Sequence, residues 1–233
     1  MDRVSKLAVI IPTVDEERSI ETCLESVGQE PSVETVVSDG GSTDATTDLA
    51  ARRGARVITG PAGRGPQLNR GARATRAEHL LFLHADCRLP QGWLPEVLAA
   101  LASPETALAC FRLHTEPAGV GEGSPVQRAW LRLLDLRSLG VGLPYGDQAY
   151  SVRREVFERI GGFPEIPLME DLVFARACRQ HGDLRRLRSA VTTSARRFQR
   201  HPVRSRVMTA TFPMLFRLGL SPDRLARLYG KVR

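Results

Sequence analysis

The chain has 233 residues, 42% of them hydrophobic, so it can fill the core of one generous domain or two small ones. No apolar run reaches the roughly 18 residues that a membrane-spanning helix needs, and no small-residue cleavage site follows the N-terminus. The four cysteines show no Cys-x-x-Cys spacing, which argues against a zinc site and a disulfide framework. We therefore expect a cytoplasmic globular protein with reduced, buried thiols.

The formal net charge of +7 is concentrated at one end of the chain. From Arg196 to Arg233 there are ten basic residues and one acid, Asp223, so this segment carries +9 and the preceding 195 residues carry −2. Such a block is typical of contact with phosphate groups on a nucleotide, on nucleic acid or on an anionic membrane surface. A solvated basic face is the alternative that the pattern leaves open.

Four short apolar runs alternate with helical patterns in the first part of the chain, and the predicted strands cover residues 7–11, 33–38, 55–58 and 79–83. Because short parallel crossovers are right-handed and place helices on both faces, this alternation predicts an α/β domain with a mostly parallel sheet flanked by helices. Ligands of such sheets bind at the carboxyl ends of the strands. Four polar segments fall at these ends and are expected to converge on one crevice: Pro12 to Glu16, Asp39 to Asp44, Gly63 to Asn69, and Asp86.

The regular alternation ends after a predicted fifth strand at residues 106–114. Gly- and Pro-rich loops at residues 116–125 and 140–146 flank a helical pattern over 126–139. A strand is predicted at 147–152, a short helix at 153–160, and a helix that starts with Glu170 and Asp171. This half is expected to be α+β material at the edge of the first, and residues 208–220 have the character of an amphipathic segment.

The fourth predicted strand runs directly into His84-Ala85-Asp86. A carboxylate at a strand end is a suitable ligand for a hard divalent cation, and such a cation would hold a diphosphate. His84 also fits a structural histidine, so the pair by itself is weak evidence for a metal site.

Three further acids and one base fit the same site. Asp39, beside a Gly-Gly turn, is suited to accept hydrogen bonds from a nucleobase or ribose, and Arg64 is suited to contact phosphates. Helix capping for Asp39 and a solvated position for Arg64 are the alternatives. Asp171 or Glu170 fits the general base that activates an acceptor, although the helix dipole also favours acids in a first turn.

Together these motifs resemble the GT-A-fold glycosyltransferases of family 2, in order and spacing over about the first 180 residues. The resemblance implies a nucleotide-diphospho-sugar donor, Mg²⁺ or Mn²⁺ held by Asp86 with His84, and transfer with inversion. It also implies that Asp171 is the catalytic base, with Glu170 beside it. Asp39 would contact the nucleobase of the donor. The nucleoside pocket would be lined by Pro12, Thr13 and Glu16. The motifs are residues 10–17, 37–44, 83–86 and 169–171.

A narrower resemblance rests on His84-Ala85-Asp86 and on Gly146-Asp147-Gln148. These segments are similar to a small bacterial subgroup of transferases linked to arsenosugar biosynthesis, and they imply an acceptor-side role for Asp147 and Gln148. His84 departs from the acid that usually opens an Asp-x-Asp motif, Asp15 stands where asparagine is commoner, and Val14 replaces an aromatic residue of many relatives.

The expected organisation is a single GT-A domain at residues 1–195, with a donor half at 1–114, an acceptor and catalytic half at 115–195, and a basic helical segment at 196–233. The acceptor is a small molecule or lipid that the sequence does not identify. Peripheral contact with an anionic membrane at its inner face is expected for the basic segment. The alternatives are nucleotidyl transfer onto a sugar phosphate and a non-catalytic nucleotide- or nucleic-acid-binding module; nucleic acid is disfavoured because few aromatics interleave the basic residues.

Overall fold

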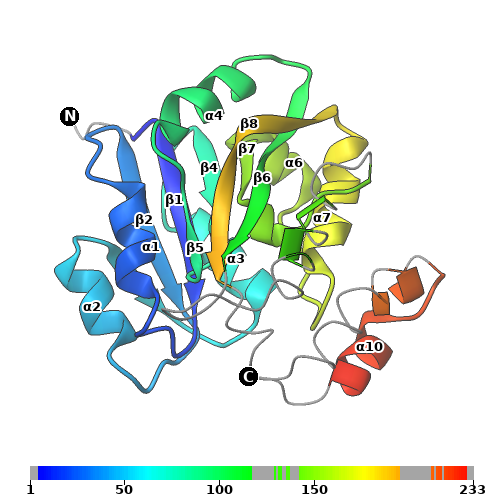
Figure 1. Cartoon of the computed structure of the whole chain (residues 1–233), viewed down its shortest axis with the longest axis horizontal. Coiled ribbons are helices and arrows are strands. Elements are labelled where there is room, and N and C mark those ends of the chain that lie inside the picture. The colour runs from blue at the N-terminus through cyan, green and yellow to red at the C-terminus, as the bar shows by residue number, and fades with distance from the viewer. Residues whose placement is uncertain are drawn as a thin grey trace.

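The computed structural model describes residues 5–116 and 142–194, residues 129, 131–132 and 135–136, and residues 211–212, 214–216 and 218–229. Within these residues the protein forms one eight-stranded sheet in the order β3-β2-β1-β4-β7-β6-β8-β5 (Figure 1). The strands are β1 (Leu7–Thr13), β2 (Val33–Asp39), β3 (Arg56–Thr59), β4 (His79–Phe82), β5 (Cys87–Arg88), β6 (Thr106–Glu116), β7 (Tyr150–Arg153) and β8 (Asp183–Ser194). The helices are α1 (Ile20–Val27), α2 (Thr46–Arg52), α3 (Arg64–Arg73), α4 (Trp93–Leu101), α6 (Arg154–Ile160), α7 (Glu170–Arg179) and α10 (Pro222–Tyr229).

The first four strands are parallel, as the alternating sequence pattern predicts. β1 lies between β2 and β4, and its register pairs Thr13 with Asp39. Parallel strands that end together bring the polar residues after them to one edge of the sheet. The predicted α/β fold with flanking helices is confirmed.

The second half of the sheet is mixed. β7 is antiparallel to β4 and β6, β8 is parallel to β6, and the short β5 is antiparallel to β8. No strand was expected at β8, because its three arginines interrupt both an apolar run and a regular alternation. β8 pairs with β6 along most of its length, and this pairing extends the sheet beyond β6.

Two expected boundaries were wrong. The strand predicted from residue 147 begins only at Tyr150, because Gly146–Gln148 form a 3-10 turn, η2. The helical pattern predicted from Asp15 becomes α1 only at Ile20, since hydrogen bonds to the loop after β2 hold residues 15–17. The helix predicted over 126–139 and the boundary at 195 lie largely outside the described residues, although residues 129, 131–132 and 135–136 are helical.

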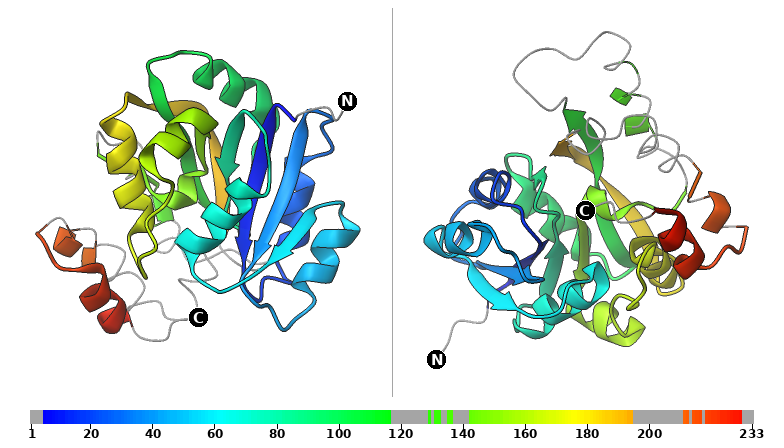
Figure 2. Two further views of the ribbon diagram at one scale, coloured as in Figure 1. Left: turned by 180° about the vertical axis from the view of Figure 1, so that it is seen from behind. Right: turned by 90° about the horizontal axis from the view of Figure 1, so that it is seen from below.

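The sheet separates two apolar layers. Leu7, Val9 and Ile11 of β1 pack with α1, α2 and α4, whereas Ala8 and Ile10 point to the opposite face, where α3, α6 and α7 pack. The period of two in a strand explains this alternation. Figure 2 shows the second face from behind.

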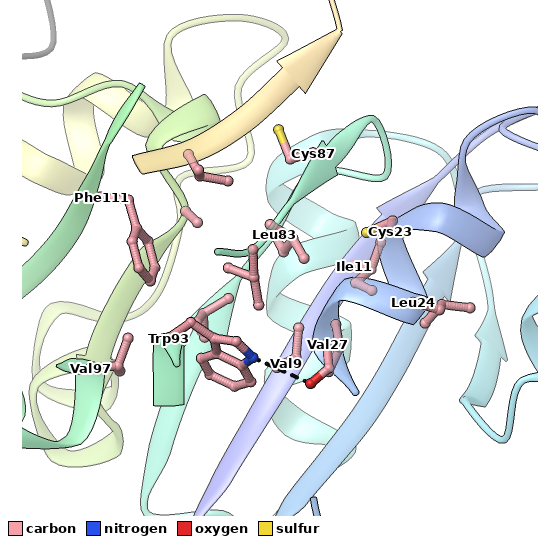
Figure 3. Close-up of a cluster of buried hydrophobic side chains, with 14 of the residues drawn as sticks. Val9, Ile11, Cys23, Leu24, Val27, Leu83, Cys87, Trp93, Val97 and Phe111 are labelled. Atoms are coloured by element: carbon pink, nitrogen blue, oxygen red, sulfur yellow. Dashed lines mark hydrogen bonds between the residues drawn. The ribbon is translucent and has the colours of Figure 1, made fainter. Parts of the chain in front are cut away.

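Figure 3 shows the first layer, in which the indole nitrogen of Trp93 donates a hydrogen bond to the carbonyl oxygen of Val27 at 3.3 Å. This bond satisfies the polar atom of a buried aromatic ring and joins the start of α4 to the end of α1. The predicted reduced cysteines are confirmed, since all four thiols are free and buried.

An aromatic cluster fixes the start of α7. The rings of Phe163 and Phe174 stack with centroids 4.1 Å apart, and Phe163 meets Phe82 of β4 edge-on at 4.9 Å. The side-chain amide of Asn69 on α3 donates to the Phe163 carbonyl and accepts from the Phe163 N–H, both at 2.8 Å. The loop before α7 is therefore held against β4 and α3, which positions Glu170 and Asp171.

None of the helices in the described ranges is both long and apolar enough to cross a lipid bilayer.

Candidate active site

Asp39, the last residue of β2, is a buried carboxylate that organises the loop after it. Its Oδ2 accepts hydrogen bonds from the backbone N–H groups of Gly41 and Ser42 at 2.8 Å, and its Oδ1 accepts one from the Thr13 hydroxyl at 3.0 Å. The Ser42 hydroxyl also contacts Oδ1. Burial raises the pKa of Asp39, but the hydrogen bonds from Ser42, Gly41 and Thr13 outweigh it, so the pKa lies below its ordinary value.

The loops after β1 and β2 are tied together. Asp15 has a positive φ of 53°, donates its N–H to the Ser42 hydroxyl at 2.9 Å, and accepts the Thr43 N–H at 2.8 Å. The Glu16 N–H donates to the Thr46 hydroxyl at 2.7 Å. A residue with a strained backbone that two hydrogen bonds hold in place is typical of a functional site, because the surrounding structure must stabilise the strained conformation.

Gln67 of α3 connects both strand ends; the sequence analysis placed it in the polar segment Gly63 to Asn69 but assigned it no role. Its buried side-chain amide donates to the carbonyl oxygens of Thr13 and Ser38, each at 2.8 Å, and accepts the Gly63 N–H at 3.1 Å. A side chain at Gly40 would meet the Gln67 amide carbon at 3.0 Å, so only glycine fits there. Gln67 thus fixes the spacing of β1, β2 and the loop that carries Arg64.

Arg64, the first residue of α3, forms an ion pair with Glu170, the first residue of α7. The Nη1 atom lies 3.0 Å from Oε1 of Glu170, whose side chain is only 2% exposed, whereas the Arg64 side chain is 37% exposed. The start of α3 also approaches the loop between α6 and α7, because a side chain at Gly65 would lie 2.4 Å from the Pro164 carbonyl oxygen. The sequence predicted both residues for the site, but it did not predict their pairing.

Three carboxylates surround the Arg64 guanidinium. Burial lowers its pKa, but Glu170, Asp171 and Asp86 raise it by more, so the pKa lies above its ordinary value. The cation therefore links the start of α7 electrostatically to the loop after β4.

Asp171 lies beside Gly146 and His84. Its Oδ2 accepts the Gly146 N–H at 2.8 Å, and its Oδ1 accepts the Leu172 N–H at 2.8 Å. A side chain at Gly146 would lie 3.2 Å from Asp171 Cβ and 3.3 Å from His84 Nε2, which shows how closely the three segments approach. Burial raises the pKa of Asp171, Glu170 raises it further, and the opposing effects of Gly146 and Arg64 are smaller.

The loop between β4 and β5 contains the candidate metal ligands. One ligand atom from each of His84, Asp86 and Cys87 lies within 4.8 Å of the other two. The sequence predicted His84 and Asp86, whereas Cys87 joins them only in the folded chain, with its thiol 3.7 Å from Asp86 Oδ1. Burial raises the pKa of the Cys87 thiol, and Asp86 raises it further. A carboxylate and an imidazole form a donor set that fits a divalent cation such as Mn²⁺.

The Gly146–Gln148 turn carries the two residues expected on the acceptor side. The Gln148 side chain is buried, donates to the Phe111 carbonyl at 2.9 Å and accepts the Tyr145 N–H at 2.9 Å, so it holds the turn in place. Asp147 is half-buried. Ala149 follows with a positive φ of 50°, and Met169 before α7 has a φ of 68°, so strained residues flank both segments that meet at Asp171.

The structure therefore places the predicted residues in two groups bridged by α3. Thr13 and Asp39 form the first group, at the ends of β1 and β2. The second group contains His84, Asp86, Arg64, Glu170 and Asp171. Gln67 at one side of α3 and Arg64 at its start connect the two.

The sequence model described as Glycosyl transferase family 2 matches residues 8–161. The chain belongs to glycosyltransferase family 2. A PGL/p-HBAD biosynthesis glycosyltransferase of Mycobacterium tuberculosis is 30% identical over 169 residues, which cover 67% of this family 2 chain and 62% of that relative. The chain thus spans less than two thirds of the length of that relative.

Solved structures share the GT-A fold of this family 2 chain. A mannosyltransferase from Pyrobaculum calidifontis in complex with GDP-Man and Mn²⁺ has a TM-score of 0.61 at 20% identity, covering 83% of this chain and 57% of that one. Glucosyl-3-phosphoglycerate synthase from Mycobacterium tuberculosis, in complex with Mn²⁺, UDP and phosphoglyceric acid, has a TM-score of 0.58 at 24% identity, covering 93% and 80%. At these identities the likeness establishes the fold.

Proposed function

We propose that this protein transfers a sugar from a nucleotide-diphospho-sugar to an acceptor hydroxyl, with inversion and with the help of a divalent cation. The observation that carries the proposal is the meeting of Asp171 and His84 at Gly146. A displacement at one carbon needs a base for the incoming group and charge stabilisation for the leaving group at neighbouring positions. The approach of α7 to the loop after β4 supplies both.

In this proposal the nucleoside binds at the ends of β1 and β2. Pro12 and Thr13 end β1, Glu16 lies in the loop after it, and Asp39 ends β2. Asp39 already accepts several hydrogen bonds from its own loop, so its first task is to hold that loop in the shape that receives the base. The partly exposed Arg64 is positioned to donate hydrogen bonds to the diphosphate.

Asp86 and His84 are the residues that would hold Mg²⁺ or Mn²⁺. The bound cation would neutralise charge that develops on the departing nucleoside diphosphate. One carboxylate and one imidazole suit Mn²⁺ better than Mg²⁺, which prefers oxygen ligands. The Mn²⁺ complexes of the two similar structures support the proposal of a divalent metal.

Asp171 would act as the general base. Its carboxylate would take the proton of the acceptor hydroxyl while that oxygen forms a bond to the anomeric carbon and the bond from that carbon to the diphosphate oxygen breaks. A single displacement of this kind inverts the anomeric centre. Glu170, buried against Arg64, would act on Asp171 through its negative charge and not by contact with the acceptor.

The acceptor would bind near the Gly146–Gln148 turn, where Asp147 would contact it and Gln148 would hold the turn. A small molecule or a lipid remains the proposed class. The narrower likeness to transferases of arsenosugar biosynthesis stays a prediction that rests on His84-Ala85-Asp86 and Gly146-Asp147-Gln148 alone.

A thermal-shift screen of UDP, GDP and their sugar conjugates, with and without Mn²⁺, tests donor binding. A ligand at about 100 times its Kd adds about 2.7 kcal/mol of stability, and each kcal/mol raises the Tm of a chain of this size by about 2–4 °C. We expect a Mn²⁺-dependent shift with one nucleoside diphosphate. Release of pyrophosphate from a nucleoside triphosphate and a sugar phosphate would instead support nucleotidyl transfer, and no shift with any nucleotide would contradict the proposal.

A further inference from the structure

The C-terminal segment presents a surface that the proposed transfer does not use. Three large apolar side chains lie in the solvent there: Met214 is 55% exposed, Leu218 is 76% exposed and Leu228 is 59% exposed. Arg224 and Arg227 of α10 are exposed beside them in the chain. We call these five residues the apolar-basic face.

The same segment has a second, inward side that anchors it to the protein. Leu225 of α10 and Phe212 are buried, and the Phe216 ring lies under the guanidinium of Arg176 on α7, 5.8 Å from its centre. Apolar residues of this segment are thus already divided into a packed set and an exposed set. The exposed set is therefore a surface feature and not the core of the segment.

Local structure keeps the exposed residues outward. A turn of helix ends where the N–H of Leu218 bonds to the Met214 carbonyl at 3.0 Å, and Gly219 follows with a φ of 94°. Ser221 then starts α10, since its hydroxyl accepts the Arg224 N–H at 3.4 Å. The exposed residues are thus carried by two short helical pieces on either side of the turn at Gly219.

The charge of the chain favours an anionic partner. The residues from 196 onward carry +9, whereas the other 195 carry −2, so the C-terminal part of the sequence has the charge that an anionic surface attracts. The exposed apolar residues are aliphatic, and aliphatic side chains insert between lipid headgroups but offer no ring on which a nucleobase can stack. The pattern of arginine with leucine and methionine therefore fits a lipid surface better than nucleic acid.

We propose that the apolar-basic face binds the surface of an anionic lipid bilayer. Arginine side chains would contact lipid phosphates, while Met214, Leu218 and Leu228 would enter the boundary between headgroups and acyl chains. The segment lies beside the end of the molecule toward which β1 and β8 run (Figures 1 and 2), which is also the end that carries the site. The orientation of the site toward the bilayer, and hence delivery of the acceptor from the membrane, rests on the proposed function.

Co-sedimentation of the full chain with vesicles tests the proposal. We expect binding to phosphatidylcholine vesicles that contain phosphatidylserine, weak binding to phosphatidylcholine alone, and release by high salt. The double variant Met214→Gln/Leu218→Gln and the double variant Arg224→Gln/Arg227→Gln should each weaken binding by about tenfold or more.

Matched controls come from other exposed positions. Leu136 is 56% exposed outside the C-terminal segment, and Arg73 and Arg76 are exposed at the end of α3, so Leu136→Gln and Arg73→Gln/Arg76→Gln should leave vesicle binding unchanged. Equal loss in these controls, no binding to anionic vesicles at low salt, or tighter binding of single-stranded RNA would overturn the proposal.

The donor screen is independent of this test. Unchanged thermal shifts by nucleotides in the two C-terminal variants would show that they keep the folded donor site. Vesicle binding without any thermal shift by nucleotides would support the membrane-binding proposal and reject the proposed transfer. A nucleotide shift without vesicle binding would reject the membrane-binding proposal alone.

Discussion

Asp39 and Asp171 are two aspartates in two regions of the same site, and their surroundings have opposite effects on them. Asp39 ends β2, where two backbone N–H groups and two hydroxyls surround the carboxylate and lower its pKa. Asp171 lies in the first turn of α7, where burial and the neighbouring Glu170 raise its pKa. The end of β2 thus stabilises an anion, and the start of α7 makes a carboxylate more ready to take a proton.

The difference shows that the carboxyl group itself does not decide the role. Hydrogen-bond donors that are fixed by a loop make Asp39 a permanent structural anion. Desolvation beside a second carboxylate gives Asp171 the basicity that a proton acceptor needs. The contrast between the two regions yields the following expectations.

The largest effect is expected for Asp171→Asn. Loss of the proton acceptor should lower kcat by about 10²–10⁴-fold, while donor affinity changes by less than about twofold. Turnover assays and calorimetry with the nucleotide sugar measure the two quantities. Asp48→Asn, at an exposed position of α2, is the matched control and should change neither. A parallel loss of donor binding would remove Asp171 from the role of base.

Asp39→Asn should reduce stability, because an amide cannot accept all the hydrogen bonds of this carboxylate. Leaving buried donors unpaired costs about 1–3 kcal/mol of unfolding free energy, measurable by urea titration. Since folding lowers the pKa of Asp39, its stabilisation is present above the unfolded pKa of about 3.9 and disappears as the pH falls through the lower folded pKa. The deficit of the variant should therefore shrink in acid.

Asp171→Asn should show the opposite pH dependence of stability. Folding raises the pKa of Asp171, so ionisation costs stability once the pH rises above the unfolded value of about 3.9. Relative to the unchanged protein, the variant should therefore gain stability from acid to neutral pH. The same pH trend in both variants would contradict the contrast between the two regions.

Gln67→Ala should destabilise the donor region by about 1–3 kcal/mol, because the carbonyls of Thr13 and Ser38 lose their buried donor. The exposed Gln91 provides the control, and Gln91→Ala should change the free energy of unfolding by less than about 0.5 kcal/mol. Urea titrations of both variants measure the free energy of unfolding. An equal loss in Gln67→Ala and Gln91→Ala would show that the hydrogen bonds of Gln67 do not stabilise the fold.

The smallest effect is expected for the ion pair beside Asp171. Arg64 lowers the pKa of Asp171 and Glu170 raises it, so the acidic limb of kcat/KM should move to higher pH in Arg64→Gln and to lower pH in Glu170→Gln. The change in kcat near neutral pH should stay below about tenfold, whereas the loss of a diphosphate contact in Arg64→Gln should appear in KM. Arg64→Lys, which keeps the charge, should restore most of the original pH profile. If the acidic limb moved in the same direction in Arg64→Gln and in Glu170→Gln, the ion pair would act only on folding.

The parallel half of the fold follows from local sequence patterns. Continuous apolar runs with helical patterns between them specify β1 to β4 and the end of the sheet at which Thr13, Asp39 and Asp86 lie, because these features depend on local periodicity and on the handedness of crossovers. The same local signals failed at β8, whose arginines hide a strand that only its partner β6 explains.

The contacts among the polar residues depend on the folded chain. The bond of Asp171 to Gly146, the ion pair of Arg64 with Glu170, and the place of Gln67 between β1 and β2 each join segments far apart in the chain. No local pattern encodes such contacts, because they depend on how α3 and α7 pack on the sheet. That packing sets the surroundings of each carboxylate, and it is the reason why the pKa of Asp39 is lowered and the pKa of Asp171 is raised.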